Sequence, residues 1–193
     1  MALSSLLVFN SVKSQAVFSN IDFHLKIATN VRGNELLYSD SSISLTFQLN
    51  DRSVKLQDNF AFIDSQLIQI TPLKVTGFAK KLDVLTPAEQ KQFLSNYSQY
   101  ELDYIGKELQ IEVIDQNNQW VPINSRNWFI WYFRVGNVPV SADKKITIQL
   151  FASTIIGGKV FTINAPMFAD ADFNKSALIV NQMMESLTVK GKK

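Results

Sequence analysis

The 193-residue chain contains no cysteine, so it cannot form a disulfide, use a thiolate nucleophile, or hold zinc or an iron–sulfur cluster through cysteine ligands. Its single histidine, His24, excludes a metal site made of several histidines. A serine triad would have to use His24, which falls on the polar side of an alternating segment, and the sequence G-x-S-x-G is absent. We therefore expect no catalytic residue, no metal site and no cofactor, and we expect that the protein is not an enzyme.

The sequence also lacks an excess of charge and any long apolar run. Nineteen basic residues stand against seventeen acidic ones, and three of the bases, Lys190, Lys192 and Lys193, lie at the C-terminus. A protein that binds nucleic acid through its phosphates needs a basic face, which this balance does not indicate. No segment approaches the ~20 consecutive apolar residues that cross a bilayer. We expect a protein partner, no nucleic acid and no membrane-spanning segment.

Glycine and proline are scarce, with seven and five residues, and 46% hydrophobic and 19% charged residues are typical of a globular protein. At this length we expect a single α+β domain over residues 17–189 and a basic tail over residues 190–193. Residues 1–16 combine a short apolar run, ALSSLLVF, with the small-x-small sequence SQA. They indicate a remnant of a signal peptide or an N-terminal extension. We favour an exported, periplasmic protein over a cytoplasmic one.

Alternating polarity predicts strands in the first part of the chain. Residues 21–27 and 43–49 place apolar side chains at every second position, which is the period of a half-buried strand. In the second half, residues 109–114 are expected to form a strand that ends in a turn at Asn117 and Asn118. Gly157 and Gly158 then predict a tight hairpin, because glycine adopts the positive φ that such turns require.

Two helices are predicted from capping residues and from apolar spacing. Thr86, Pro87 and Glu89 form a capping box at the start of the first helix, and Gly106 indicates its end. The second helix is expected to follow Asp172 as its N-cap, with an apolar seam at every third or fourth residue: Phe173, Ala177, Val180, Met184 and Leu187. The order of elements favours an α+β fold, a mostly antiparallel sheet covered by two amphipathic helices in an α/β/α sandwich.

The segment WFIWYFR, residues 128–134, contains five aromatic residues and has no polar side in either alternating set. A strand that is buried on both faces has this composition, so we expect a core strand in a sheet with helices on both sides. The alternative is a partly exposed aromatic surface that binds a protein, a peptide or a sugar.

Three other patterns have simple explanations. The sequence GGKV only partly matches a phosphate-binding loop and fits a hairpin turn better. Asp170 and Asp172 could pair on a divalent cation, but a helix start explains them. A pair of catalytic carboxylates stays open, because distance in space is not visible in a sequence. The candidates are Asp83, Glu101, Asp103, Glu108, Glu112 and Asp115.

Residues 89–189 resemble the Mog1/PsbP-like fold group, including the bacterial DcrB-like proteins. The resemblance lies in the Tyr-rich helix NYSQYELDYIGKEL, the strands WFIWYF and GGKVFTINAP, and the closing helix FADADFNKSALIVNQMMESLTV. It implies an α/β/α sandwich around an antiparallel sheet. It also implies a non-catalytic role, because members of the group bind a small GTPase, stabilise a photosystem or chaperone secreted effectors.

Our first functional hypothesis is a non-enzymatic protein-binding module or an assembly or chaperone-type factor. Its contact surface is placed at the turn-rich end that carries Trp120 and Arg126. The second hypothesis is a binder of a small molecule or lipid, with an apolar pocket between sheet and helix, and it requires an enclosed apolar cavity of about 300 Å³ or more. The third is a hydrolase with an unrecognised carboxylate pair, which requires two buried acids in one cleft.

Overall fold

The computed structural model describes residues 16–136, 146–169 and 171–191. Most of the predicted N-terminal segment, residues 1–15, lies outside these ranges. Asp170 and the last two lysines lie outside them as well. The strands of a large sheet are, in spatial order, β5 (Val54–Gln57), β6 (Phe60–Ile63), β7 (Gln66–Thr76), β11 (Lys159–Phe168), β10 (Ile146–Ile156), β9 (Arg126–Val135) and β8 (Val113–Ile123), and β1 (Val17–Asn20) pairs with the end of β7. A small sheet has the order β12 (Thr188–Gly191), β4 (Ile43–Asn50), β3 (Gly33–Ser39) and β2 (His24–Asn30).

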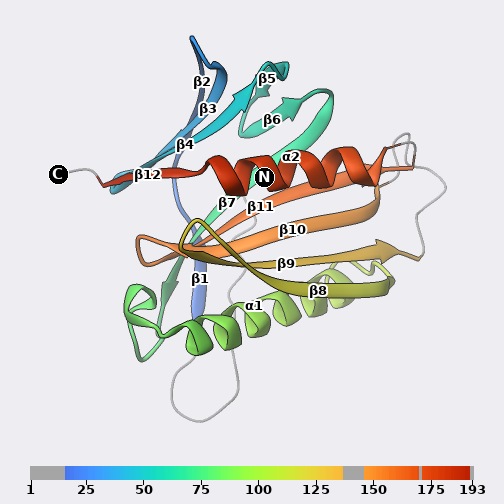
Figure 1. Ribbon diagram of the computed structural model, residues 1–193. Helices are drawn as coiled ribbons and strands as arrows, with labels where there is room; N and C mark the ends of the chain where they lie inside the picture. Colours follow the sequence, from blue (N-terminus) through green and yellow to red (C-terminus); the bar gives the residue numbers. More distant parts are fainter. Residues whose placement is uncertain (1–15, 137–145, 170, 192–193) are drawn as a thin grey trace.

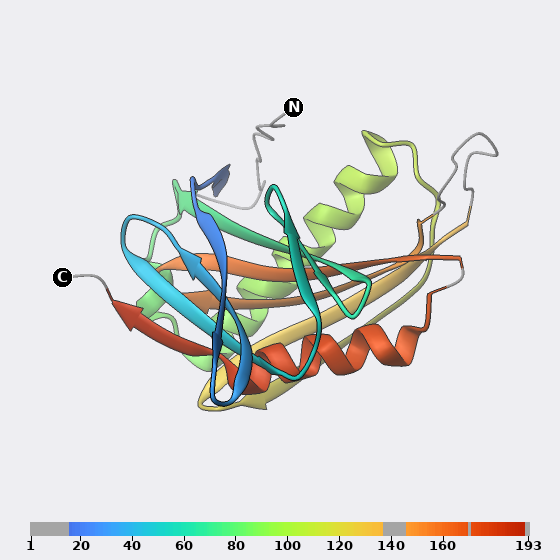
Figure 2. The ribbon, with the colours of Figure 1, turned by 90° about the horizontal axis from the view of Figure 1, so that it is seen from above.

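Two helices and the small sheet cover the large sheet. Helix α1 (Pro87–Lys107), preceded by the short turn η1 (Leu82–Val84), lies on one face, and α2 (Phe173–Ser186) lies on the other (Figure 1). The small sheet packs beside α2 on that second face, so the two share one core (Figure 2). Every pairing between described strands is antiparallel. The predicted α+β fold with helices on both faces is confirmed, and the second sheet is an addition to it.

Strand β9 carries the aromatic segment and is buried on both faces, as predicted. Trp128 points to the α2 side, where it is fully buried. Phe129, Trp131 and Phe133 point to the α1 side and are at most 3% exposed. β9 lies second from the edge of the sheet, between β10 and β8, so both of its edges are paired. Ile130 and Tyr132, on the same face as Trp128, are only half-buried, so the alternative of a partly exposed surface still applies to that part of the strand.

Local signals placed several element boundaries correctly. Thr86 accepts a hydrogen bond from the Glu89 N–H while the Glu89 carboxylate accepts from the Thr86 N–H, so the predicted capping box is confirmed. The helix ends at Lys107, one residue after Gly106. Gly157 and Gly158 have φ values of 56° and 71° and connect β10 to β11, as the hairpin prediction required.

Three sequence-based boundaries differ from the structure. The first alternating segment enters a strand only at His24, which is exposed at the start of β2. Asn117 and Asn118 do not form a turn, because they pair with Tyr132 and Trp131 of β9 inside β8. The irregularity in β8 is instead a bulge between Ile114 and Asn117, where the register with β9 shifts. At the C-terminus β12 runs to Gly191 along β4, so the strand extends two residues into the segment expected to be a tail.

A buried ion pair joins the small sheet to the large one. Lys159 Nζ, at the start of β11, donates to Asp40 Oδ2 over 2.7 Å, and the Asp40 side chain is completely buried. Tyr38 Oη donates to the same oxygen over 2.6 Å. Burial alone would raise the pKa of the Asp40 carboxyl, but the hydrogen bonds from Lys159, Tyr38 and the N–H groups of Ser42 and Ile43 hold this pKa below its ordinary value. The turn before β4 is thereby fixed against the β10–β11 hairpin.

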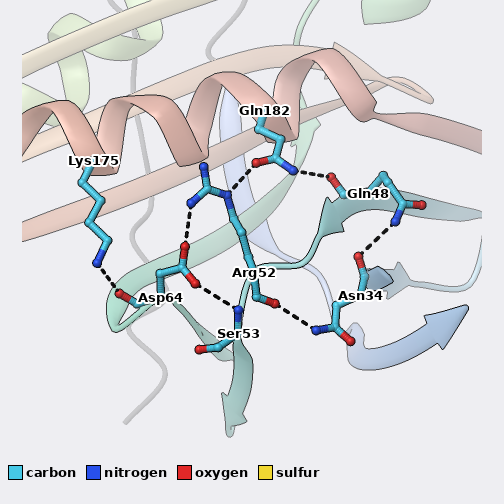
Figure 3. A network of polar contacts seen from close by, with 7 residues as sticks. All are labelled: Asn34, Gln48, Arg52, Ser53, Asp64, Lys175 and Gln182. Atoms are coloured by element: carbon cyan, nitrogen blue, oxygen red, sulfur yellow. Dashed lines mark hydrogen bonds and ion pairs between the residues drawn. The ribbon is translucent and has the colours of Figure 1, made fainter. Parts of the chain in front are cut away.

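A second polar network fixes α2 against the small sheet (Figure 3). Arg52 lies at its centre, with Nε donating to Gln182 Oε1 of α2 and Nη1 donating to Asp64 Oδ2, each over 2.6 Å. Gln182 in turn donates to the Gln48 carbonyl of β4 over 3.2 Å. Lys175, which lies two turns before Gln182 in α2, donates through Nζ to the Asp64 carbonyl over 2.8 Å. Two positions of α2, two turns apart, are therefore attached to the chain that joins β4 to β7.

The Asp40–Lys159 pair predicts a large and specific loss of stability. Asp40→Asn leaves the Lys159 ammonium without its charged partner, so we expect the free energy of unfolding to fall by about 3 kcal/mol. The difference from wild type should shrink below about pH 4, because the contribution of a carboxyl with a lowered pKa is lost as it becomes protonated. Urea unfolding at several pH values measures both effects. Asp103→Asn, on the exposed Asp103–Lys107 pair of α1, is the control and should change stability by less than about 0.5 kcal/mol.

Candidate functional site

An open groove of about 630 Å³ lies between α2 and the outer strands of the large sheet. Its floor is formed by Ile130 and Tyr132 of β9 and Leu150 of β10. Phe173, Ala177, Leu178, Val180 and Met184 form the wall that α2 contributes. The floor follows from the register of β9, because Ile130 and Tyr132 share the face of the fully buried Trp128 but lie farther along the strand.

The groove exists because α2 is rotated relative to the seam expected from its sequence. The residues of α2 that are buried include Ser176, Ile179 and Met183, which face the small sheet and β7. Ser176 Oγ donates to Gln66 Oε1 over 3.0 Å and fixes this orientation. Two residues of the predicted seam, Phe173 and Ala177, are consequently only half-buried and lie along the groove. The predicted helix is confirmed, but its most buried side is displaced by about one residue.

The rim of the groove is polar and carries no charge. Four amide side chains surround the apolar floor, two from β8 and two from α2: Asn117, Gln119, Asn174 and Asn181. Asn118 also borders the groove, but its side chain lies on the α1 face of β8, as does that of Trp120. No acidic or basic residue is found among the described residues that line the groove. Each primary amide carries two N–H donors and a carbonyl acceptor, so this rim can both donate to and accept from a ligand.

One end of the groove is closed by an aromatic pair. The rings of Tyr132 and Phe173 meet edge to face, with centroids 5.4 Å apart and an interplanar angle of 64°. At the other end the β8–β9 turn lies against the end of α2, where the Asn124 side-chain amide donates to the Glu185 carbonyl. Asn124 and Ser125 both have positive φ, which is typical of a tight two-residue hairpin.

Strand β8 forms one side of the groove and is the outermost strand of the large sheet. Its partner on the inner side is β9, paired from Asn117 to Ile123 without irregularity. An outermost strand presents backbone N–H and C=O groups that can pair with an added chain. The bulge at Asp115, where φ is 50°, limits such pairing to the part of β8 that borders the groove.

The structure does not bring the two predicted contact residues together. Trp120 pairs with Phe129 and packs on its ring, with centroids 6.1 Å apart, on the α1 face of the sheet. Arg126 begins β9 and shares the face of Trp128, toward α2. A partner that contacts both side chains would have to wrap around the β8–β9 hairpin. Neither residue lines the groove, and their role in binding stays a prediction.

The acidic residues considered for hydrolysis are not assembled into a pair in one cleft. Glu101 is mostly buried, but the five other candidates are exposed on the surface of the described chain. Asp172 accepts a hydrogen bond from the Asn174 N–H over 2.8 Å and acts as the N-cap of α2. Within the described ranges no group of three or more His, Asp or Glu side chains could hold a metal ion. The groove itself offers binding rather than an acid, a base or a nucleophile.

Sequence reasoning missed the amide rim because it assigned Asn117 and Asn118 to a turn. The uncharged run QNNQ, residues 116–119, was the available signal, since four consecutive neutral polar residues without glycine or proline also fit an outermost strand. The apolar floor was part of the predicted core strand, but its partial exposure depends on where α2 lies.

Comparison with known proteins adds a similarity of fold. No family model matches the chain, and no curated protein matches it either. The solution structure of cyanobacterial PsbP (CyanoP) from Synechocystis sp. PCC 6803 matches with a TM-score of 0.42 and 10% sequence identity, over 86% of this chain and 92% of that chain. The architecture that the sequence resemblance implied, an antiparallel sheet with a helix on each face, is the one that the structure shows. The match covers more of the chain than residues 89–189 and says nothing about function.

No helix in the described ranges is long and apolar enough to cross a membrane.

The position of α2 predicts that a lysine substitution is tolerated at Leu178 but not at Val180. Leu178 is 62% exposed at the rim, whereas Val180 is 1% exposed beneath it. Leu178→Lys should therefore change the free energy of unfolding by less than about 0.5 kcal/mol. Val180→Lys buries an unpaired ammonium and should cost at least about 3 kcal/mol. Thermal unfolding followed by circular dichroism compares the two, and equal losses would contradict the placement of α2.

Proposed function

We propose that the protein is a non-catalytic binding module that holds an extended, uncharged segment of a partner protein in the groove between β8 and α2. The observation that supports it is the combination of an apolar floor with a rim of four neutral amide side chains beside an outermost strand. Apolar side chains of the segment would enter the floor, while its peptide groups would pair with the amides and with β8.

The dimensions of the groove suit a short extended peptide. The lining residues of α2 run from Phe173 to Met184, which corresponds to about 17 Å at the rise of an α-helix. About five residues of extended chain have the same length. Side chains of a strand alternate between two directions, so two or three of them would point into the floor. A charged side chain there would lose hydration without an ion partner, which favours an uncharged segment.

A second candidate is a small apolar molecule or lipid bound in the same groove. The groove has a volume of about 630 Å³, but it is open, whereas the sequence-based hypothesis required an enclosed cavity of about 300 Å³ or more. The open shape therefore counts against this candidate. The amide rim favours the peptide, since a hydrocarbon chain offers the rim amides neither a donor nor an acceptor, whereas peptide groups offer both. The two ligands are distinguished by the experiment below.

Peptide selection tests the proposal directly. The purified protein is used to select from a displayed library of random seven-residue peptides, and one selected peptide is labelled for fluorescence polarisation. We expect apolar residues at alternate positions and no charged residue between them. Leu178→Lys should weaken binding at least about tenfold, because it places a charge beside the apolar floor.

The matched control is Asn96→Lys, which adds the same side chain to an exposed position of α1 on the opposite face. It should bind the peptide as wild type does. Equal affinities of the two lysine variants, or a selection dominated by charged peptides, would contradict the peptide proposal. If no peptide is selected and oleate binds to wild type but not to Leu178→Lys, the groove belongs to the lipid hypothesis.

Trp120→Ala and Arg126→Ala belong in the same assay, because these residues carry the surface predicted from the sequence. The groove proposal expects both variants to retain binding, since neither side chain lines the groove. Loss of binding in both would move the contact surface to the β8–β9 hairpin and favour a partner that wraps around it.

Export remains part of the proposal and is tested at the N-terminus. We expect the protein isolated from its native host to begin near Val17 and to lie outside the cytoplasm, as the sequences ALSSLLVF and SQA indicate. Intact mass and N-terminal sequencing of each cell fraction measure this. A chain that begins at Met1 in the cytoplasm would contradict export and favour an adaptor or chaperone role.

A further inference from the structure

A second pocket lies on the α1 face of the large sheet, opposite the groove. It has a volume of about 340 Å³, is partly open, and is bordered by α1, β1, β7, β10 and β11. Its most unusual feature is a row of hydroxyl side chains across three strands of the sheet. Thr71 of β7 pairs with Thr162 of β11, which pairs with Ser153 of β10. Ser153 and Thr162 are at most 2% exposed.

Among the described residues that line this pocket, Glu101 of α1 is the only acidic one, and none is basic. It forms a hydrogen bond with the Tyr97 hydroxyl, which also bonds with Thr162. Thr162 Oγ1 and Ser153 Oγ are 3.0 Å apart, and Trp131 Nε1 donates to Ser153 Oγ over 3.5 Å. The carboxyl thus ends a buried polar chain that crosses the sheet from β9 to α1.

The surroundings of Glu101 penalise its negative charge. Burial raises the pKa of Glu101 to about 7, and the hydrogen bond with Tyr97 offsets only part of this effect. Near neutral pH the carboxylate is therefore charged at a cost in solvation, with no positive side chain from the pocket lining to compensate it. A cation that enters the pocket would supply the missing charge.

The other lining residues suit a ligand with one charged end and an apolar body. Gln69, Thr71, Gln149 and Asn164 provide oxygen acceptors for additional N–H groups near the carboxylate. Phe151 and the aromatic ring of Tyr104 provide faces that attract a cation, and Leu73, Ile105 and Leu109 form an apolar wall. The volume is near the lower limit of ligand pockets, so a ligand of few atoms fits.

We propose that this pocket is a binding site for a small protonated alkylamine, with Glu101 as its counter-ion and the lining side chains of Gln69, Thr71, Gln149 and Asn164 as acceptors. The site lies on the face opposite the peptide groove and does not depend on the function proposed for it.

The titratable groups that face the pocket are few. On α1 they are Glu101, Tyr97 and Tyr104, while Tyr100 and Glu108 act from nearby on the same helix. β1, β7, β10 and β11 contribute only residues that do not ionise. An alkylamine stays protonated below about pH 9, so Glu101 is the group whose charge changes between pH 5.5 and pH 8.5. Amine affinity should consequently rise with pH over this interval.

The test uses n-butylamine as the probe and 1-butanol as a neutral molecule of similar shape, with binding measured by calorimetry. We expect butylamine to bind at pH 8.5, to bind at least about tenfold more weakly at pH 5.5, and to release a proton near pH 6.5. Butanol should bind much more weakly than the amine at pH 8.5. Glu101→Gln should abolish amine binding, while Glu108→Gln, which removes the same charge from the exposed C-cap residue that follows the same helix, should not.

A stability measurement shows whether the Glu101 charge behaves as the geometry requires. The raised pKa lowers stability as the pH increases from about 4.5 to 7, because the folded state then has to hold a charge that the unfolded state accepts readily. Glu101→Gln should therefore melt above wild type at pH 8.5 and close to it at pH 4.5. A difference that does not change with pH would overturn the proposal. Equal binding of butylamine and butanol, retention of binding in Glu101→Gln, or no binding of butylamine at pH 8.5 would overturn it as well.

Discussion

The fold depends on one constraint, which is that β9 has no polar face. Each aromatic side chain buried from water contributes on the order of 2 to 3 kcal/mol, and the strand carries five between Trp128 and Phe133. Both faces of the sheet at β9 must therefore be covered. α1 covers the side of Phe129, Trp131 and Phe133, and the layer with α2 covers the side of Trp128. The α/β/α arrangement is a direct consequence of this double burial.

The second sheet follows from the width of the first. Seven strands at their usual spacing extend for about 29 Å, whereas a helix with its side chains is about 10 to 12 Å wide. α2 alone cannot cover such a face. The small sheet covers the part that remains, where Tyr38 and Phe47 pack on the ring of Phe161 in β11. Since a sheet laid over another can slide, specific polar contacts are needed to fix its position. The Asp40–Lys159 pair and the Arg52 network meet this need at two separate points.

Features encoded within a few residues could be predicted from the sequence. The capping box at Thr86, the alternation of β4 and the Gly157–Gly158 turn each depend on local geometry, and each agrees with the structure. The turn assigned to Asn117 and Asn118 was wrong because β9 imposes a strand on them through pairing, which a local propensity does not reveal. The rotation of α2 depends on Gln66, which is 110 residues from Ser176 in the chain. Likewise, the burial of Glu101 depends on the strands that face it, which are distant in the sequence.

The groove and the second pocket each lie where a helix covers one face of the large sheet only in part. Their chemical difference follows from the side chains that remain accessible there. On the α2 side the floor is a continuation of the apolar face of β9, so only the rim, supplied by an outermost strand and a helix flank, is polar. On the α1 side the aromatic part of the sheet ends at Phe151, and the polar row of Thr71, Thr162 and Ser153 lies beyond it. Burying these hydroxyls in a core would offer little by itself, since hydrogen bonds within proteins only modestly outweigh those with water. These hydroxyls lie near the Glu101 carboxyl, which has no positive partner among the described lining residues. A bound ligand explains this arrangement better than a contribution to stability does.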